Sequence, residues 1–127
     1  MKRTLMVTLC VLAVALGVCA VCQRALDGAV EEAERLTSLA VLAANEQRFS
    51  DAKTLMGTLA EFWQRRSRVL ETLAGHDALH DVASAIAEAQ ICLECEDRDD
   101  FLRTMSIVRM GLEHLKDEEA VSLMNLY

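Results

Sequence analysis

Two histidines stand four positions apart, at His76 and His80, and an aspartate follows each of them. On a helix this spacing places both imidazoles on one face, where they can supply two ligands to a metal ion. A third ligand would have to come from another segment, such as His114. The pair is not part of a His-Glu-x-x-His motif and brings no general base. We therefore expect His76 to cap or pack at the Gly75 turn and His80 to be a solvated surface residue, with no bound metal. A metal or small-ligand sensor that uses this face is the alternative.

Cys92 and Cys95 form a Cys-x-x-Cys motif. Thioredoxin-like redox sites place this motif at the start of a helix after a strand, where the pKa of the thiol is lowered. Here the motif comes near the end of a predicted helix and close to Glu94, Glu96 and Asp97, whose negative charge raises the pKa of a thiol. We expect a buried Cys92 and an exposed Cys95 without a redox function. A local disulfide between them stays open.

An aromatic pair and a basic cluster follow each other in the middle of the chain. Phe62 and Trp63 lie on a predicted apolar stripe, so Trp63 is expected in the core, and an exposed anchor for a partner is the alternative. Arg65, Arg66 and Arg68 come directly after it. This cluster is expected to be solvated surface with i,i+4 ion pairs, or else to bind an anion or a neighbouring acidic helix.

No other pattern in the sequence indicates catalysis. The chain has no Gly-x-Ser-x-Gly motif and no glycine-rich phosphate loop. Carboxylates are plentiful, but their number alone is no evidence for a glycosidase pair. The net charge of -7 argues against binding to nucleic acid, which needs a basic face. We expect a protein that is not an enzyme and has no cofactor.

The elements that must position these residues are helices. The chain has 127 residues, no proline and five glycines, which is enough for one domain and argues against a turn-rich β-sandwich. Apolar residues recur at helical spacing throughout, and no stretch alternates long enough for a half-buried strand. The sequence therefore predicts an all-α protein.

The segment from Thr4 to Gln23 contains no charged residue. Its 20 residues would span about 30 Å as a helix, which is the thickness of a bilayer's hydrocarbon core. Lys2 and Arg3 precede it, and acidic residues follow it. We expect residues 1–23 to be an uncleaved signal anchor, with the N-terminus in the cytoplasm and residues 24–127 outside the cell membrane. In a spore former, that outer face can instead lie between mother cell and forespore.

Two other interpretations of the apolar segment remain open. A cleaved signal peptide would need a better site than Ala20-Val21-Cys22, and a lipoprotein would be modified at Cys19 or Cys22. Lys2 and Arg3 carry two positive charges, so residues 24–127 carry -9. Anionic headgroups should repel such a domain, and we expect it to stand off from the membrane on its anchor helix.

The acidic outer domain is expected to contain four helical segments. The first continues from the anchor without a break to about Ala44, and a turn follows at 45–48. The second runs from an N-cap at Ser50 to Gly75, the third follows Asp77, and the fourth begins after a polar stretch at 94–98, with Asp99 or Asp100 as its cap. A tail from Asp117 adds one or two turns.

Each segment has a predicted apolar stripe that faces the core. In chain order, the stripes are Leu26, Val30, Ala33, Leu36, Leu39 or Ala40, and Ala43; Ala52, Leu55, Met56, Leu59, Phe62, Trp63, Val69, Leu70 and Leu73; Leu79, Val82, Ala83, Ile86, Ala89, Gln90 and Leu93; and Leu102, Met105, Val108, Leu112 and Leu115.

A faint internal repeat of about 50 residues relates the two halves of this domain. It predicts two αα-hairpins, each with a polar turn between two apolar stripes. Short connections make neighbouring helices antiparallel. The sequence does not separate a four-helix antiparallel bundle from two tetratricopeptide-like helical hairpins.

The order of these features resembles the domain-of-unknown-function 4363 family, small membrane-anchored proteins of Gram-positive, often spore-forming, bacteria. The resemblance is carried by the basic start and apolar segment, the Ser-Asp-x-Lys helix start, Trp63, His76 and the ending with Ser122, Leu123 and Asn125. Phe49 and Leu70 stand where the family often has tryptophan, and His80 stands where an acidic residue is usual. The family has no established activity, so the resemblance implies topology only.

Together these observations predict a single-pass membrane protein with an interaction or scaffold role. Its expected partner is another membrane or envelope protein, because an anchor raises the effective concentration of neighbours in the same plane. The candidate interaction residues are Trp63, Arg65, Arg66, His76, Ser122 and Asn125.

Overall fold

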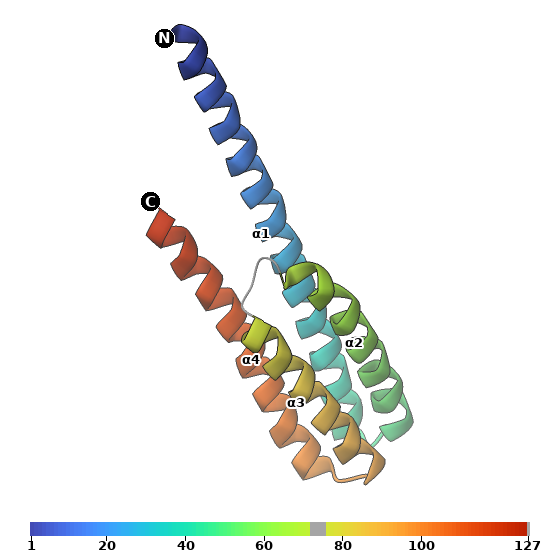
Figure 1. Cartoon of the computed structure of the whole chain (residues 1–127). Coiled ribbons are helices and arrows are strands. Elements are labelled where there is room, and N and C mark those ends of the chain that lie inside the picture. Colours follow the sequence, from blue (N-terminus) through green and yellow to red (C-terminus); the bar gives the residue numbers. More distant parts are fainter. Residues whose placement is uncertain (72–75, 127) are drawn as a thin grey trace.

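The computed structural model of the chain describes residues 1–71 and 76–126, and the side chains of 1–71 and 76–117. These residues form α-helices joined by short turns, with no strand in the described part. The helices are α1 (Lys2–Asn45), α2 (Phe49–Leu70), α3 (His76–Glu94) and α4 (Arg98–Leu126) (Figure 1). The predicted all-α class is confirmed.

The four helices close into a ring. In the described residues, α1 packs against α2 and α4, and α3 packs against the same two helices, whereas the Cα atoms of the diagonal pairs stay more than 8 Å apart. A solenoid of two hairpins would leave its first and last helices apart, so the contact between α1 and α4 identifies a four-helix antiparallel bundle. Two hairpins, α1–α2 and α3–α4, meet along two seams, α1/α4 and α2/α3.

Helix α1 is longer than the bundle to which it belongs. It runs without interruption from Lys2 to Asn45, as the absence of proline predicts, and its N-terminal end extends beyond the other helices (Figure 1). The large apolar side chains between Leu5 and Val21 are 54–68% exposed. Burial begins at Leu26, which is 4% exposed. One helix therefore joins a solvent-exposed apolar segment to the bundle core.

The core follows the predicted stripes closely. Ala40 takes the inward position and leaves Leu39 38% exposed. Two assignments were wrong: Val69 is 64% exposed and Ala83 is exposed, because each lies about 100° around its helix from the buried neighbour Leu70 or Val82. Phe101, which the predicted stripe omits, is fully buried.

The two hairpins turn in the same way. Gln47 and Glu96 have φ of 60° and 53°, and the amide of the next residue donates to the carbonyl five residues back, from Arg48 to Ala43 (2.8 Å) and from Asp97 to Cys92 (3.0 Å). This is the Schellman arrangement with a non-glycine residue in the left-handed position. Gln47 and Glu96 are 49 positions apart, which agrees with the predicted repeat.

The predicted N-caps are wrong by a few residues. Helix α2 begins at Phe49, so Ser50 lies inside it, and its N-cap Arg48 makes no capping bond. Asp97 caps α4, where its Oδ1 accepts a hydrogen bond from the amide of Asp100 at 3.1 Å. The tail predicted after Asp117 is continuous with α4 up to Leu126, whereas Gly75 and Leu73 lie outside the described residues.

Candidate functional site

The two histidines lie on one face at the start of α3, as their spacing predicts. Their rings are parallel to within 13° with centroids 6.1 Å apart, and both residues are exposed. Nδ1 of His76 lies 3.2 Å from Oε1 of Glu71, a contact that becomes an ion pair when the imidazole is protonated. In the described part of the chain, no group of three His, Cys, Asp or Glu side chains gathers to hold a metal ion. His114 is not brought to this pair.

The Cys-x-x-Cys motif lies at the end of α3, away from the histidines. Cys92 is half-buried, with Sγ 3.8 Å from Oγ1 of Thr104, and Cys95 is exposed in the turn. The two cysteines are not joined by a disulfide. Their position at the C-terminal end of a helix agrees with the sequence prediction, although Cys92 is less buried than expected.

Trp63 is part of the core, as expected, and the alternative of an exposed anchor is wrong. Its side chain is 1% exposed, and its indole Nε1 donates a hydrogen bond to the carbonyl oxygen of Leu79 at 3.1 Å. This bond connects α2 to α3. The indole therefore fixes the α2/α3 seam at the end of the bundle from which α1 extends.

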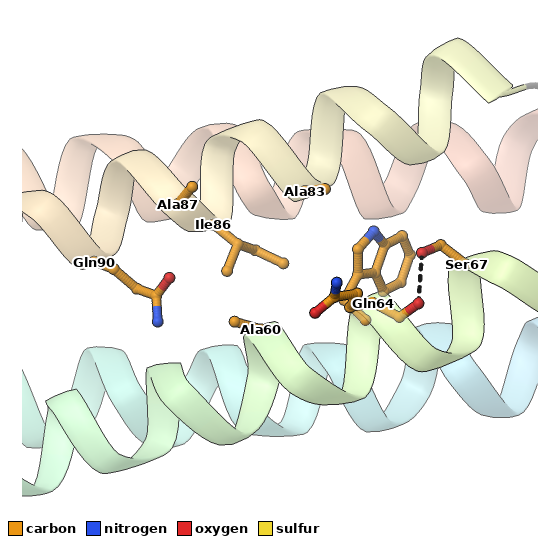
Figure 2. A pocket seen from close by; sticks show the side chains of 8 residues that line it. Ala60, Gln64, Ser67, Ala83, Ile86, Ala87 and Gln90 are labelled. Atoms are coloured by element: carbon orange, nitrogen blue, oxygen red, sulfur yellow. Dashed lines mark hydrogen bonds between the residues drawn. The ribbon is translucent and has the colours of Figure 1, made fainter.

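A groove follows the α2/α3 seam next to this tryptophan (Figure 2). Its volume is about 280 Å³. Small side chains leave the space, and the amides of Gln64 and Gln90 face it from the two helices (Figure 2). The residues that line the groove carry no charge: Ala60, Trp63, Gln64, Ser67, Ala83, Ile86, Ala87 and Gln90. In a chain with 26% charged residues, this is an uncharged strip of surface.

The α1/α4 seam on the other side of the bundle has the opposite character. Nζ of Lys116 lies 3.1 Å from the carboxylate of Glu34, and a guanidinium nitrogen of Arg109 donates to Oγ of Ser38 at 3.3 Å. Each of these contacts joins one hairpin to the other. Polar side chains thus cover this seam, whereas the α2/α3 seam is open.

The arginine cluster lies at the C-terminal end of α2. Arg65, Arg66 and Arg68 are exposed, and the guanidinium carbon of Arg66 lies 5.6 Å from the ring centroid of Phe62. The i,i+4 ion pairs expected for this cluster are not found among the described residues. Ser122 and Asn125 belong to α4, but their side chains lie outside the described part.

Two other surface arginines, Arg35 on α1 and Arg48 in the turn after it, are held by carboxylates. Arg35 bonds Glu32 at 2.6 Å, which holds the pKa of the Glu32 carboxyl below its usual range. Arg48 bonds Glu46 at 2.7 Å and Asp51 at 3.0 Å, and these hydrogen bonds raise the pKa of its guanidinium. These pairs are solvated, so they contribute little to stability.

Comparison with known proteins places the bundle in a family. The chain matches the family described as Domain of unknown function (DUF4363) over residues 21–126. The protein belongs to the DUF4363 family. The matched range of this DUF4363 protein begins at the end of the apolar segment and includes all of α2, α3 and α4, so the resemblance stated from sequence is confirmed. Neither a curated protein nor a solved structure matches the chain.

The groove of this DUF4363 protein was not predicted from sequence. Alanine and glutamine give no functional pattern, and four of the lining residues belong to the predicted apolar stripes: Trp63, Ala83, Ile86 and Gln90. The signal in the sequence is the absence of charge at Ala60, Ala83 and Ala87, which lie where α2 and α3 meet. These uncharged positions form a groove only because α2 and α3 pack side by side.

Proposed function

We propose that this protein is a membrane-anchored, non-catalytic interaction module, and that the α2/α3 groove receives a helix of another membrane or envelope protein. The uncharged groove beside Trp63 is the observation that supports it. Helical bundles bind partner helices in grooves of this kind, where alternate side chains of the partner fill the space. Small side chains in the walls allow two helix backbones to approach closely.

The partner is specified by the chemistry of the groove. Its walls offer alanine surface for apolar contact, and the amides of Gln64 and Gln90 offer both donors and acceptors. A helix with small apolar residues and one or two uncharged polar residues on one face matches these walls. A charged helix face would lose hydration against the alanines without gaining an ion pair.

The apolar half of α1 supports the membrane part of the proposal. None of the most apolar 18 residues of α1 is buried. This helix is therefore not the covered core helix of a soluble domain. By length and composition the helix can cross a membrane as an anchor, and a signal sequence has the same properties. We take it as an anchor with the bundle outside the cytoplasm, the orientation favoured by Lys2 and Arg3.

Site-specific photocrosslinking in native membranes tests the groove. A photoreactive residue at Gln64 or Gln90 of the full-length protein should give an adduct whose peptide maps to a helix of a membrane or envelope protein. Ala83→Leu fills the groove and should abolish the adduct. Ser84→Leu places the same side chain at the neighbouring exposed position, which does not line the groove, and should leave the adduct unchanged.

Two outcomes would contradict the proposal. One is the same adduct from a photoreactive residue at Glu113, which is exposed on α4. The other is an adduct that survives Ala83→Leu as well as Ser84→Leu. Membrane extraction separates the anchor from the groove, because a chain released by high salt or alkali is not anchored, whatever it binds.

The second candidate function is a metal or small-ligand sensor at His76 and His80. The parallel rings of these residues favour it, since both imidazoles lie on one face of α3 with centroids 6.1 Å apart. Two imidazoles bind a divalent ion weakly without a third ligand from elsewhere. A rise in melting temperature with Zn²⁺ or Ni²⁺ that His80→Ala removes would favour the sensor over the interaction module.

A further inference from the structure

The arginine cluster of α2 lies level with the point where α1 leaves the bundle. Leu70 comes 22 residues after Arg48, and Arg24 comes 22 residues before Glu46, on the two arms of the first hairpin. The arms are antiparallel helices with the same rise per residue, so Leu70 and Arg24 are at the same height. Figure 1 shows the end of α2 beside this part of α1.

This height places the cluster close to the membrane when α1 is the anchor. Arg24 is the first charged residue after the apolar segment. Arg68, Arg66 and Arg65 precede Leu70 by two, four and five residues, which corresponds to about 3, 6 and 7.5 Å along the helix axis. The headgroup layer of a bilayer is about 5–7 Å thick on each side, so all three side chains reach it.

The three guanidinium groups are not held by any carboxylate of the described residues. No described residue forms an ion pair with Arg65, Arg66 or Arg68, and the contact made by Arg66 is the one with the Phe62 ring. At the opposite end of the bundle, Arg48 is held by two carboxylates. A free guanidinium binds phosphate oxygens through two parallel hydrogen bonds, which lysine does not match.

We propose that Arg65, Arg66 and Arg68 bind the phosphates of anionic phospholipids in the membrane that α1 spans, and so hold the α2 edge of the bundle against the headgroups. The inference rests on the anchor of the proposed function but not on the groove. Cationic residues near an anionic surface each favour the bound state by about fivefold, so three of them favour it by about a hundredfold.

The contact is limited to the α2 edge because the two helices packed against α2 carry exposed carboxylates at this end. Asp27 and Glu31 are exposed on α1, and Asp77 and Asp81 are exposed on α3. These carboxylates are repelled by the headgroups that attract α2. The net charge of -9 on residues 24–127 prevents the bundle from lying flat, as the sequence indicates, and the arginines tilt it toward the α2 side.

Hydrogen exchange in lipid nanodiscs tests this contact. The full-length protein is reconstituted in discs of neutral phosphatidylcholine and in discs that also contain phosphatidylglycerol. Peptides that cover 61–71 should exchange several-fold more slowly in the anionic discs. High salt, which shortens the Debye length to about 3 Å at 1 M, should remove this protection. Inorganic phosphate added to neutral discs should not reproduce it.

Two triple variants, each of which removes three positive charges, distinguish the effect of where the charges lie from the effect of net charge. Arg65→Gln, Arg66→Gln and Arg68→Gln together should remove the protection. Lys53→Gln, Arg98→Gln and Arg103→Gln together change residues at the other end of the bundle and should retain it.

Equal exchange in neutral and anionic discs, loss of protection in both triple variants, or protection by phosphate alone would overturn the lipid contact. A chain that does not enter the discs would overturn the anchor first. Crosslinking at the groove is independent of all these results.

Discussion

The two seams between the hairpins close the same bundle by different means. Along α1/α4, the pair Glu34–Lys116 and the Arg109–Ser38 hydrogen bond join the helices at their surface. Along α2/α3, the bond from Trp63 to Leu79 joins them inside, and the surface above the other lining residues is left as a groove. The seams therefore differ in how much of their surface the side chains leave uncovered.

This difference supports the choice of the α2/α3 seam as the proposed binding surface. One ion pair and one hydrogen bond lie on the α1/α4 seam, and a helix docked there would have to remove them from water. The α2/α3 seam is joined inside by Trp63 and its bond to Leu79, so its outer surface is available for the proposed binding. Substitutions at the two seams should accordingly differ in size and in salt dependence.

The largest effect is expected from Trp63→Ala. It removes a fully buried indole and its bond to Leu79, and truncations of this kind cost about 3–5 kcal/mol. Denaturant unfolding of the detergent-solubilised protein measures the loss. Trp63→Phe keeps most of the volume and should cost less. If Trp63→Ala costs under about 1 kcal/mol, then the indole does not hold the α2/α3 seam.

Gly111→Ala tests the contact within a hairpin, for comparison with the two seams between the hairpins. Gly111 lies where α3 and α4 approach closely. A Cβ at Gly111 would lie 2.8 Å from Cγ2 of Val82, a buried β-branched side chain that cannot move freely. Overpacking should outweigh the gain in helix propensity and leave a net loss of about 1 kcal/mol.

Gly57→Ala on α2 is the matched control for this substitution. A Cβ there would meet no atom within 4 Å, so the helix propensity of alanine should raise stability by up to about 1 kcal/mol. Thermal melts of the two variants should therefore shift in opposite directions. Shifts of the same sign would show that the α3/α4 approach is not as tight as the structure has it.

The smallest effect is expected from Lys116→Gln at the α1/α4 seam. Both side chains of the Glu34–Lys116 pair are more than a third exposed, and such a pair contributes up to about 1 kcal/mol at low salt. The loss should shrink as salt is added, whereas the loss in Trp63→Ala should not. A large, salt-independent cost at Lys116 would remove the proposed difference between the seams.

Local periodicity underlies the features of the fold that could be predicted from sequence. The continuous first helix was readable because nothing between Lys2 and Ala44 breaks a helix, and the core was readable because Leu26, Val30 and Ala33 recur at helical spacing. The family was readable from the order of features along the whole chain. These properties depend on residues close to one another in sequence.

The remaining features depend on the packing of distant segments. The choice between bundle and solenoid is decided by contact between α1 and α4, whose residues Glu34 and Lys116 are 82 positions apart. The helix starts were misplaced because Gln47 and Glu96 adopt the left-handed conformation without glycine as a marker. The groove forms only where α2 and α3 are aligned, and its lining residues form no motif that indicates a function.

The continuity of α1 has a mechanical consequence. The same rigid rod forms the apolar segment and one corner of the bundle, so a rotation inside the membrane is transmitted to the far turn without a hinge to absorb it. With α1 as the proposed anchor, residues 24–45 extend about 33 Å beyond the membrane boundary. A tilt of about 20°, common for single membrane helices, would sweep the turn at Gln47 sideways by about 11 Å. The proposed anchor thus acts as a lever, and the tilt of α1 in the membrane determines the position of the bundle.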